Sequence, residues 1–63
     1  MFRIVYFKEG EEIGSMPHVG PVEATQKFAR DGLIRHGADL ARIIDVGGSG
    51  EEVDRVKRDA DRT

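Results

Sequence analysis

The chain opens with a regular alternation of side chains over residues 2–8, FRIVYFK. Successive side chains of a β-strand point to opposite faces, and β-branched and aromatic residues favour strands, so this stretch predicts a strand. Both faces are partly apolar, which predicts a helix over one face and another segment or a second subunit over the other. The two faces carry Phe2, Ile4 and Tyr6 on one side and Arg3, Val5 and Phe7 on the other.

A glycine-containing turn follows at residues 8–11, KEGE. The next segment, EEIGS over residues 11–15, returns as a short second strand and completes an antiparallel hairpin. The stretch MPHVGP, residues 16–21, is expected to interrupt the regular structure, because proline and glycine break it.

A helix is predicted from Pro21 to about residue 36. Proline suits the first turn of a helix, because the N–H that it lacks would have no partner there. Gly32 lies on the apolar arc although glycine costs about 1 kcal/mol relative to alanine in a helix, so we expect the helix backbone to approach the sheet closely there. Gly37 is expected to end the helix as a left-handed cap. The apolar arc consists of Val22, Thr25, Phe28, Ala29, Gly32 and Leu33.

A third strand is predicted over residues 40–46, LARIIDV, where β-branched residues return after the helix. The order strand, strand, helix, strand predicts an α+β fold in which one central helix packs on one face of a small antiparallel sheet.

The segment after VGGSGEEV, residues 46–53, leaves two conformations open. Ser49 and Glu52 have capping-box spacing, which favours a C-terminal helix and a ββαβα order. The sequence GGSG also suits a hairpin loop, and a fourth strand would protect the edge of the third. Such a strand places Val53 and Val56 on opposite faces unless a bulge intervenes. We favour the strand and therefore a ββαββ order.

The same glycine cluster does not predict a phosphate site. A phosphate loop feeds a helix N-terminus and usually directs a lysine or a hydroxyl at the anion. Here Glu51 and Glu52 occupy that position, and their carboxylates repel an incoming anion.

The 63 residues predict a single small domain near the lower size limit, with residues 58–63 frayed. The chain has no cysteine, which excludes a disulfide framework and is compatible with a cytoplasmic location. No apolar run is long enough for a signal peptide or a membrane span. Charged residues make up 35% of the chain with a net charge of -2, so no overall field attracts nucleic acid or anionic lipid.

Residues with catalytic or ligand-binding chemistry are scarce. His18 is expected in a loop and His36 at the helix end, and neither has a carboxylate at metal-ligand spacing. No nucleophile and base are found in a recognisable arrangement. We therefore expect no enzyme activity, no metal and no cofactor.

The stretch KFARDGLIRHGADLARIID, followed by GSG, EV and VKRDA, resembles a family of small bacterial proteins to which no function has been assigned. The resemblance covers nearly the whole chain and implies a central helix between two hairpins. This sequence departs from the family at Asp54, where relatives often carry a bulky apolar residue.

Two functions remain as hypotheses. The first is a small interaction module that binds an unknown protein or self-associates as a homodimer, because Ile34 lies opposite the apolar arc and the second face of the first strand also needs cover. The alternative is weak nucleic-acid binding, in which an aromatic side chain of the first strand stacks on bases between Arg3, Lys8 and Arg42. The candidate interaction residues are Ile34, Lys27, Arg30, Tyr6 and Phe7.

Overall fold

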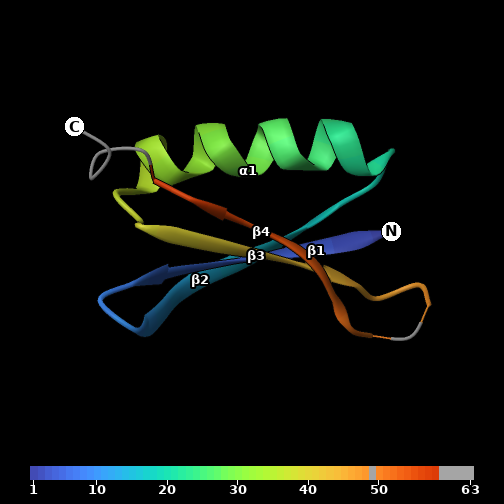
Figure 1. Ribbon diagram of the computed structural model, residues 1–63, viewed down its shortest axis with the longest axis horizontal. Helices are drawn as coiled ribbons and strands as arrows, with labels where there is room; N and C mark the ends of the chain where they lie inside the picture. Colours follow the sequence, from blue (N-terminus) through green and yellow to red (C-terminus); the bar gives the residue numbers. More distant parts are fainter. Residues whose placement is uncertain (49, 59–63) are drawn as a thin grey trace.

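A computed structural model describes residues 1–48 and 50–58 of the chain. Its elements are β1 (Phe2–Lys8), β2 (Glu11–His18), α1 (Val22–His36), β3 (Leu40–Asp45) and β4 (Glu52–Lys57). The strands form one antiparallel sheet in the order β2-β1-β3-β4, and α1 runs along one side of it (Figure 1). The predicted ββαββ arrangement is confirmed. The alternative of a helix in the last segment is wrong, because Glu52–Lys57 pair with β3.

The first hairpin turns through Glu9 and Gly10, which have φ angles of 53° and 85°. A two-residue turn with both φ angles positive matches the right-handed twist of the flanking strands. The returning strand β2 continues to His18, beyond the predicted end, because Pro17 does not break it. Since β2 is an edge strand, the missing N–H of Pro17 can face away from the sheet.

Helix α1 begins and ends where the sequence predicts. Pro21 precedes it with extended backbone, and Gly37 closes it in the left-handed conformation at φ 69°. The N–H of Ala38 donates to the carbonyl of Leu33 at 2.9 Å, so one of the last helical carbonyls has a partner.

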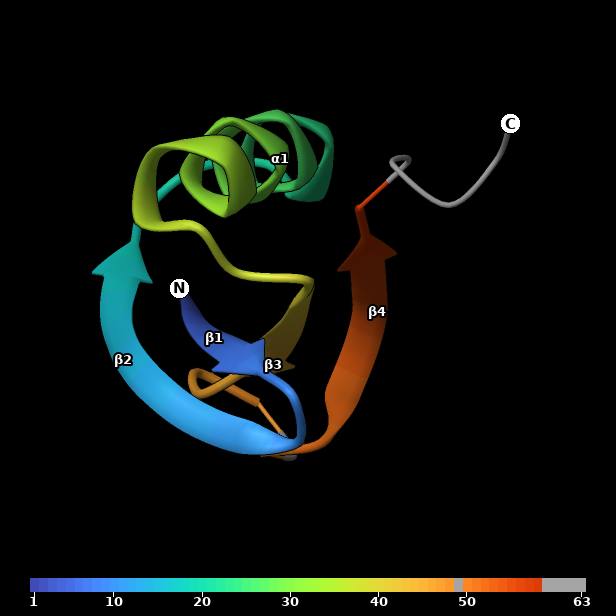
Figure 2. The same cartoon turned by 90° about the vertical axis from the view of Figure 1, so that its left-hand side faces the viewer.

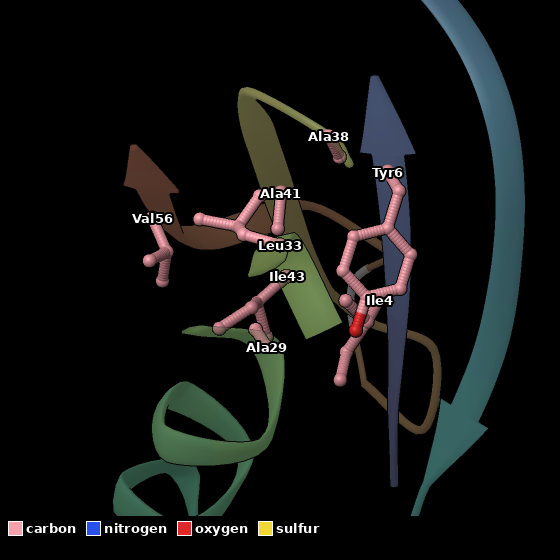
Figure 3. Close-up of a cluster of buried hydrophobic side chains, with 8 residues drawn as sticks. All are labelled: Ile4, Tyr6, Ala29, Leu33, Ala38, Ala41, Ile43 and Val56. Atoms are coloured by element: carbon pink, nitrogen blue, oxygen red, sulfur yellow. The ribbon is translucent and has the colours of Figure 1, made fainter. Parts of the chain in front are cut away.

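The hydrophobic core lies between α1 and the sheet, where the buried side chains converge (Figure 3). Three of these residues are alanines, which allow the helix to lie close to the strands. Partly buried Phe2, Met16 and Phe28 pack around the cluster. Its members are Ile4, Tyr6, Ala29, Leu33, Ala38, Ala41, Ile43 and Val56.

The predicted close approach at Gly32 is confirmed. A Cβ atom at this position would lie 1.9 Å from the hydroxyl oxygen of Tyr6. That oxygen is buried and has no hydrogen-bond partner among residues 1–48 and 50–58, and burial raises the pKa of the phenol. The tyrosine ring therefore occupies the space that a side chain at position 32 would need.

His18 is not the plain loop residue that the sequence analysis expects. It ends β2, and its Nδ1 lies 2.8 Å from the hydroxyl of the buried Thr25. Its ring also stacks on Phe28 with a centroid distance of 5.0 Å. Thr25 donates to the carbonyl of Pro21 at 3.1 Å, so the imidazole joins the end of β2 to the first turns of α1.

The fourth strand contains a bulge, but Val53 stays 48% exposed while Val56 is buried. Asp54 pairs with Ile43 and Glu52 pairs with Ile44, so the register shifts by one residue at Val53. Val56 and Asp54 share the helix side, where Gln26 of α1 donates a hydrogen bond to the Asp54 carboxylate. A carboxylate is therefore accommodated where an apolar side chain is expected.

Two sequence expectations fall wholly or partly outside the described residues. The cap at Ser49 cannot be compared, since that residue lies between the described ranges. Of the predicted frayed segment 58–63, only Arg58 is described, and its N–H donates to the carbonyl of Asp39 at 3.2 Å.

We predict that Gly32→Ala lowers the free energy of unfolding by about 1–3 kcal/mol, because the new methyl group overlaps the Tyr6 ring. Helix propensity alone would raise it by about 1 kcal/mol. Chemical denaturation measures the difference. Gly14→Ala is the matched control, since a Cβ there meets nothing within 4 Å. Equal or greater stability of Gly32→Ala would contradict the close approach.

We predict that Tyr6→Phe raises the free energy of unfolding by about 1 kcal/mol, because it removes a buried hydroxyl without a partner. The same denaturation experiment tests this. A clear loss of stability would mean that the hydroxyl has a stabilising partner. Coupling with Gly32→Ala is expected, since the two groups compete for one space.

Candidate interaction surface

The face of the sheet opposite α1 has no cover in the part of the chain that the structure describes (Figures 1 and 2). Its two central strands carry four half-buried apolar residues, Val5 and Phe7 of β1 and Leu40 and Ile44 of β3, together with Arg3 and Arg42. We call this side of the sheet the open face. Apolar residues grouped on two central strands are typical of a surface that contacts another molecule.

The strand register arranges the open face in three rows that each cross all four strands. Residues directly opposite one another in antiparallel strands share a face, so each row can be followed from edge to edge. The rows, from β2 to β4, are Glu12, Phe7, Leu40, Lys57, then Ser15, Val5, Arg42, Arg55, then Pro17, Arg3, Ile44, Glu52. Apolar residues thus lie mainly on the central strands and charged residues mainly at the edges.

One carboxylate holds two arginines on this face. Glu52 accepts hydrogen bonds from Nε of Arg42 at 2.5 Å and from Nε of Arg55 at 2.7 Å. Glu52 and Arg55 are three residues apart and would lie on opposite faces of a regular strand. The bulge at Val53 places Glu52 and Arg55 on the same face of the sheet, so the two side chains can form an ion pair.

These hydrogen bonds change the acid–base behaviour of the cluster. The Arg55 and Arg42 guanidinium groups lower the pKa of Glu52 from its usual 4.5 to about 2. Reciprocally, the hydrogen bond to Glu52 raises the pKa of Arg55. Glu52 therefore stays ionised at neutral and mildly acidic pH.

Two further contacts order the arginines of the open face. The guanidinium carbon of Arg42 lies 5.9 Å from the centroid of the Phe7 ring, and Arg3 donates to the hydroxyl of Ser15 at 3.2 Å. The first contact lies within the range of a cation–π interaction. Arg42 is thus held between an aromatic ring and a carboxylate.

The predicted interaction residues do not form one surface. Phe7 lies on the open face, whereas Tyr6 points to α1 and is only 2% exposed. Ile34 is 70% exposed on the outer side of α1, with Lys27 and Arg30 exposed on the same helix. Since α1 covers the other face of the sheet, Ile34 and Phe7 lie on opposite sides of the molecule. One two-fold interface therefore cannot bury both residues.

The sequence analysis omits most of the open face. Arg3 and Arg42 are predicted there as nucleic-acid contacts, and no charged residue of β2 or β4 is predicted to lie on an interaction surface. Alternation along residues 40–46 could have added Leu40 and Ile44. A second register shift lies in β2 at Ile13, between the pairs Tyr6–Gly14 and Phe7–Glu12. Together with the bulge at Val53 it decides the face of the charged residues that were not predicted there, Glu12, Glu52, Arg55 and Lys57.

A second surface feature is a groove of about 430 Å³ beside the end of α1. It is lined by Tyr6, Ile13, Gly14, Ser15, Met16 and His36. The ring of His36 packs against that of Tyr6 with centroids 5.1 Å apart. Neither this groove nor any other part of residues 1–48 and 50–58 groups three His, Cys, Asp or Glu side chains in a way that could hold a metal ion.

Comparisons with protein-family models, curated proteins and solved structures found no match for this chain. Within the described residues, no helix has the length and apolar character needed to cross a membrane.

We predict that the Glu52 carboxylate titrates near pH 2 in the folded protein, which carbon-detected NMR of its side chain measures. Because its folded pKa lies below the unfolded value, its contribution to stability is present above about pH 4.5 and is lost as the pH falls toward 2. Arg55→Gln should move the midpoint upward. An unchanged midpoint in that variant would contradict the assigned cause.

Proposed function

We propose that this protein is a non-catalytic interaction module that self-associates through the open face of its sheet. The observation that supports this most directly is the group of half-buried apolar residues Val5, Phe7, Leu40 and Ile44 on the central strands, which no described element covers. Burying such a group against a partner removes apolar surface from water and stabilises the complex.

The edges of the sheet are less suited to association than its open face. A free edge can bind a further strand through its unpaired backbone groups. Here the edge strand β2 contains Pro17 and the edge strand β4 contains the bulge at Val53. Proline and bulges both hinder the addition of a strand, so they favour contact through the face.

The small core provides a reason for association. A domain of this length buries a low fraction of its surface, and only one side of the sheet contributes to its core. Binding to the folded state alone would add stability by mass action. Self-association would therefore supply the second covering layer that the first strand predicts.

Nucleic-acid binding through the sheet is the weaker hypothesis. Its aromatic candidate Tyr6 is buried beneath α1, which leaves Phe7 as the aromatic ring of the open face. Two of the arginines there already pair with Glu52, which reduces their positive potential toward a phosphate backbone. Retarded electrophoretic mobility of single-stranded oligonucleotides in the presence of the protein at low salt would support nucleic-acid binding.

We predict that Phe7→Thr raises the dissociation constant of the self-associated form at least tenfold, since it removes a large apolar anchor but keeps strand propensity. Sedimentation velocity over a concentration series measures this. Ile34→Thr is the matched control on the outer side of α1 and should leave association unchanged. A wild-type protein that stays monomeric at millimolar concentration would overturn the proposal.

A further inference from the structure

We infer that the partner on the open face is a second copy of this chain. The two-fold axis lies in the interface between the two sheets, runs parallel to the strands and passes over the boundary between β1 and β3. In this arrangement Glu12 of one protomer faces the partner's Lys57. The inference rests on the proposed function and adds the geometry of the complex to it.

Glu12 and Lys57 are the two ends of one row of the open face. Three strand spacings of about 4.8 Å separate them by roughly 14 Å, which is too far for an ion pair within one chain. Both side chains are exposed, and in the described part of the chain neither has a hydrogen-bond or ion-pair partner. The same row thus ends in a free carboxylate on β2 and a free ammonium group on β4.

The proposed axis exchanges the two halves of each row. It brings β2 over the partner's β4 and β1 over the partner's β3, because the strand order is β2-β1-β3-β4. Phe7 then packs on the partner's Leu40, and Glu12 meets the partner's Lys57. Two-fold symmetry repeats both contacts, so one row supplies two apolar contacts and two ion pairs.

A face-to-face dimer can also form around a two-fold axis that lies in the interface and runs perpendicular to the strands, but this arrangement is less favourable. It leaves each strand over its own copy and exchanges the first row with the third. The middle row then faces itself, which stacks Arg42 on the partner's Arg42 and Arg55 on the partner's Arg55. Glu52 pairs with both arginines, but one carboxylate leaves them with a net positive charge, so this axis brings two positive middle rows together. Charge complementarity therefore favours the axis parallel to the strands.

The shape of the sheet permits face-to-face packing. Sheets that pack face to face keep their strand directions within about 30° of each other, because both have the same twist. Two copies of one sheet meet this condition. The face spans roughly 20 Å along the strands and 14 Å across them, which is at the small end for specific interfaces, so we expect a dissociation constant on the order of micromolar.

The test uses the charge-reversal variants Glu12→Lys and Lys57→Glu. Each creates two like-charge pairs in its homodimer and should raise the dissociation constant about tenfold. Mixing the two variants restores opposite charges at both pairs, so the heterodimer should form in preference to either homodimer. Native mass spectrometry with one variant ¹⁵N-labelled counts the three species. The double variant should regain wild-type association.

A single-chain role cannot produce this pattern, because residues 12 and 57 do not contact each other within a protomer. If Lys57→Glu weakens self-association and Glu12→Lys does not, the perpendicular axis is favoured, in which Lys57 faces the partner's Glu52. That result would overturn the inference. A dimer that is sensitive to Phe7→Thr but to neither charge reversal would overturn the geometry and leave the proposed function intact. A wild-type monomer at all concentrations would overturn both. Thermal denaturation checks that each variant is folded.

Discussion

The contact between Gly32 and Tyr6 sets the distance between the helix and the sheet. Because position 32 has no side chain, the phenol ring lies directly against the helix backbone, and the hydroxyl is enclosed without a hydrogen-bond partner among the described residues. The neighbouring core residues Ala29, Ala38 and Ala41 are small enough to maintain this separation. The single helix covers one face of the sheet, and in the described part of the chain the apolar side chains of the other face have no cover.

Local patterns were sufficient to predict most of this fold. Residues 2–8, the helix with its caps at Pro21 and Gly37, and the close approach at Gly32 follow from alternation, periodicity and the conformational freedom of glycine. The extension of β2 through Pro17 was not predictable in the same way. A missing N–H matters only where a neighbouring strand needs it, and the sequence does not say that β2 lies at the edge of the sheet.

The composition of the open face is harder to predict from local sequence patterns than the order of helix and strands, because it depends on how the elements pair and pack. Alternation separates the set containing Tyr6 from the set containing Phe7, but it does not say which set the helix covers. The ion pair between Glu52 and Arg55 is harder still to predict, because it requires a bulge whose position is set by pairing with β3. The His18 contact with Thr25 likewise joins two elements that no local pattern connects.

The charges of the open face fall into two groups with different consequences. Glu52 pairs with both Arg42 and Arg55 within the chain, and Arg42 also lies over Phe7, so these side chains form an ordered surface between the apolar residues. Glu12 and Lys57 lie at the ends of their row, outside this network. Charges satisfied within the protomer add little selectivity for a partner, whereas unpaired charges at the rim can fix its orientation. The bulge at Val53 contributes to this division, because it places Glu52 on the face where it engages both arginines.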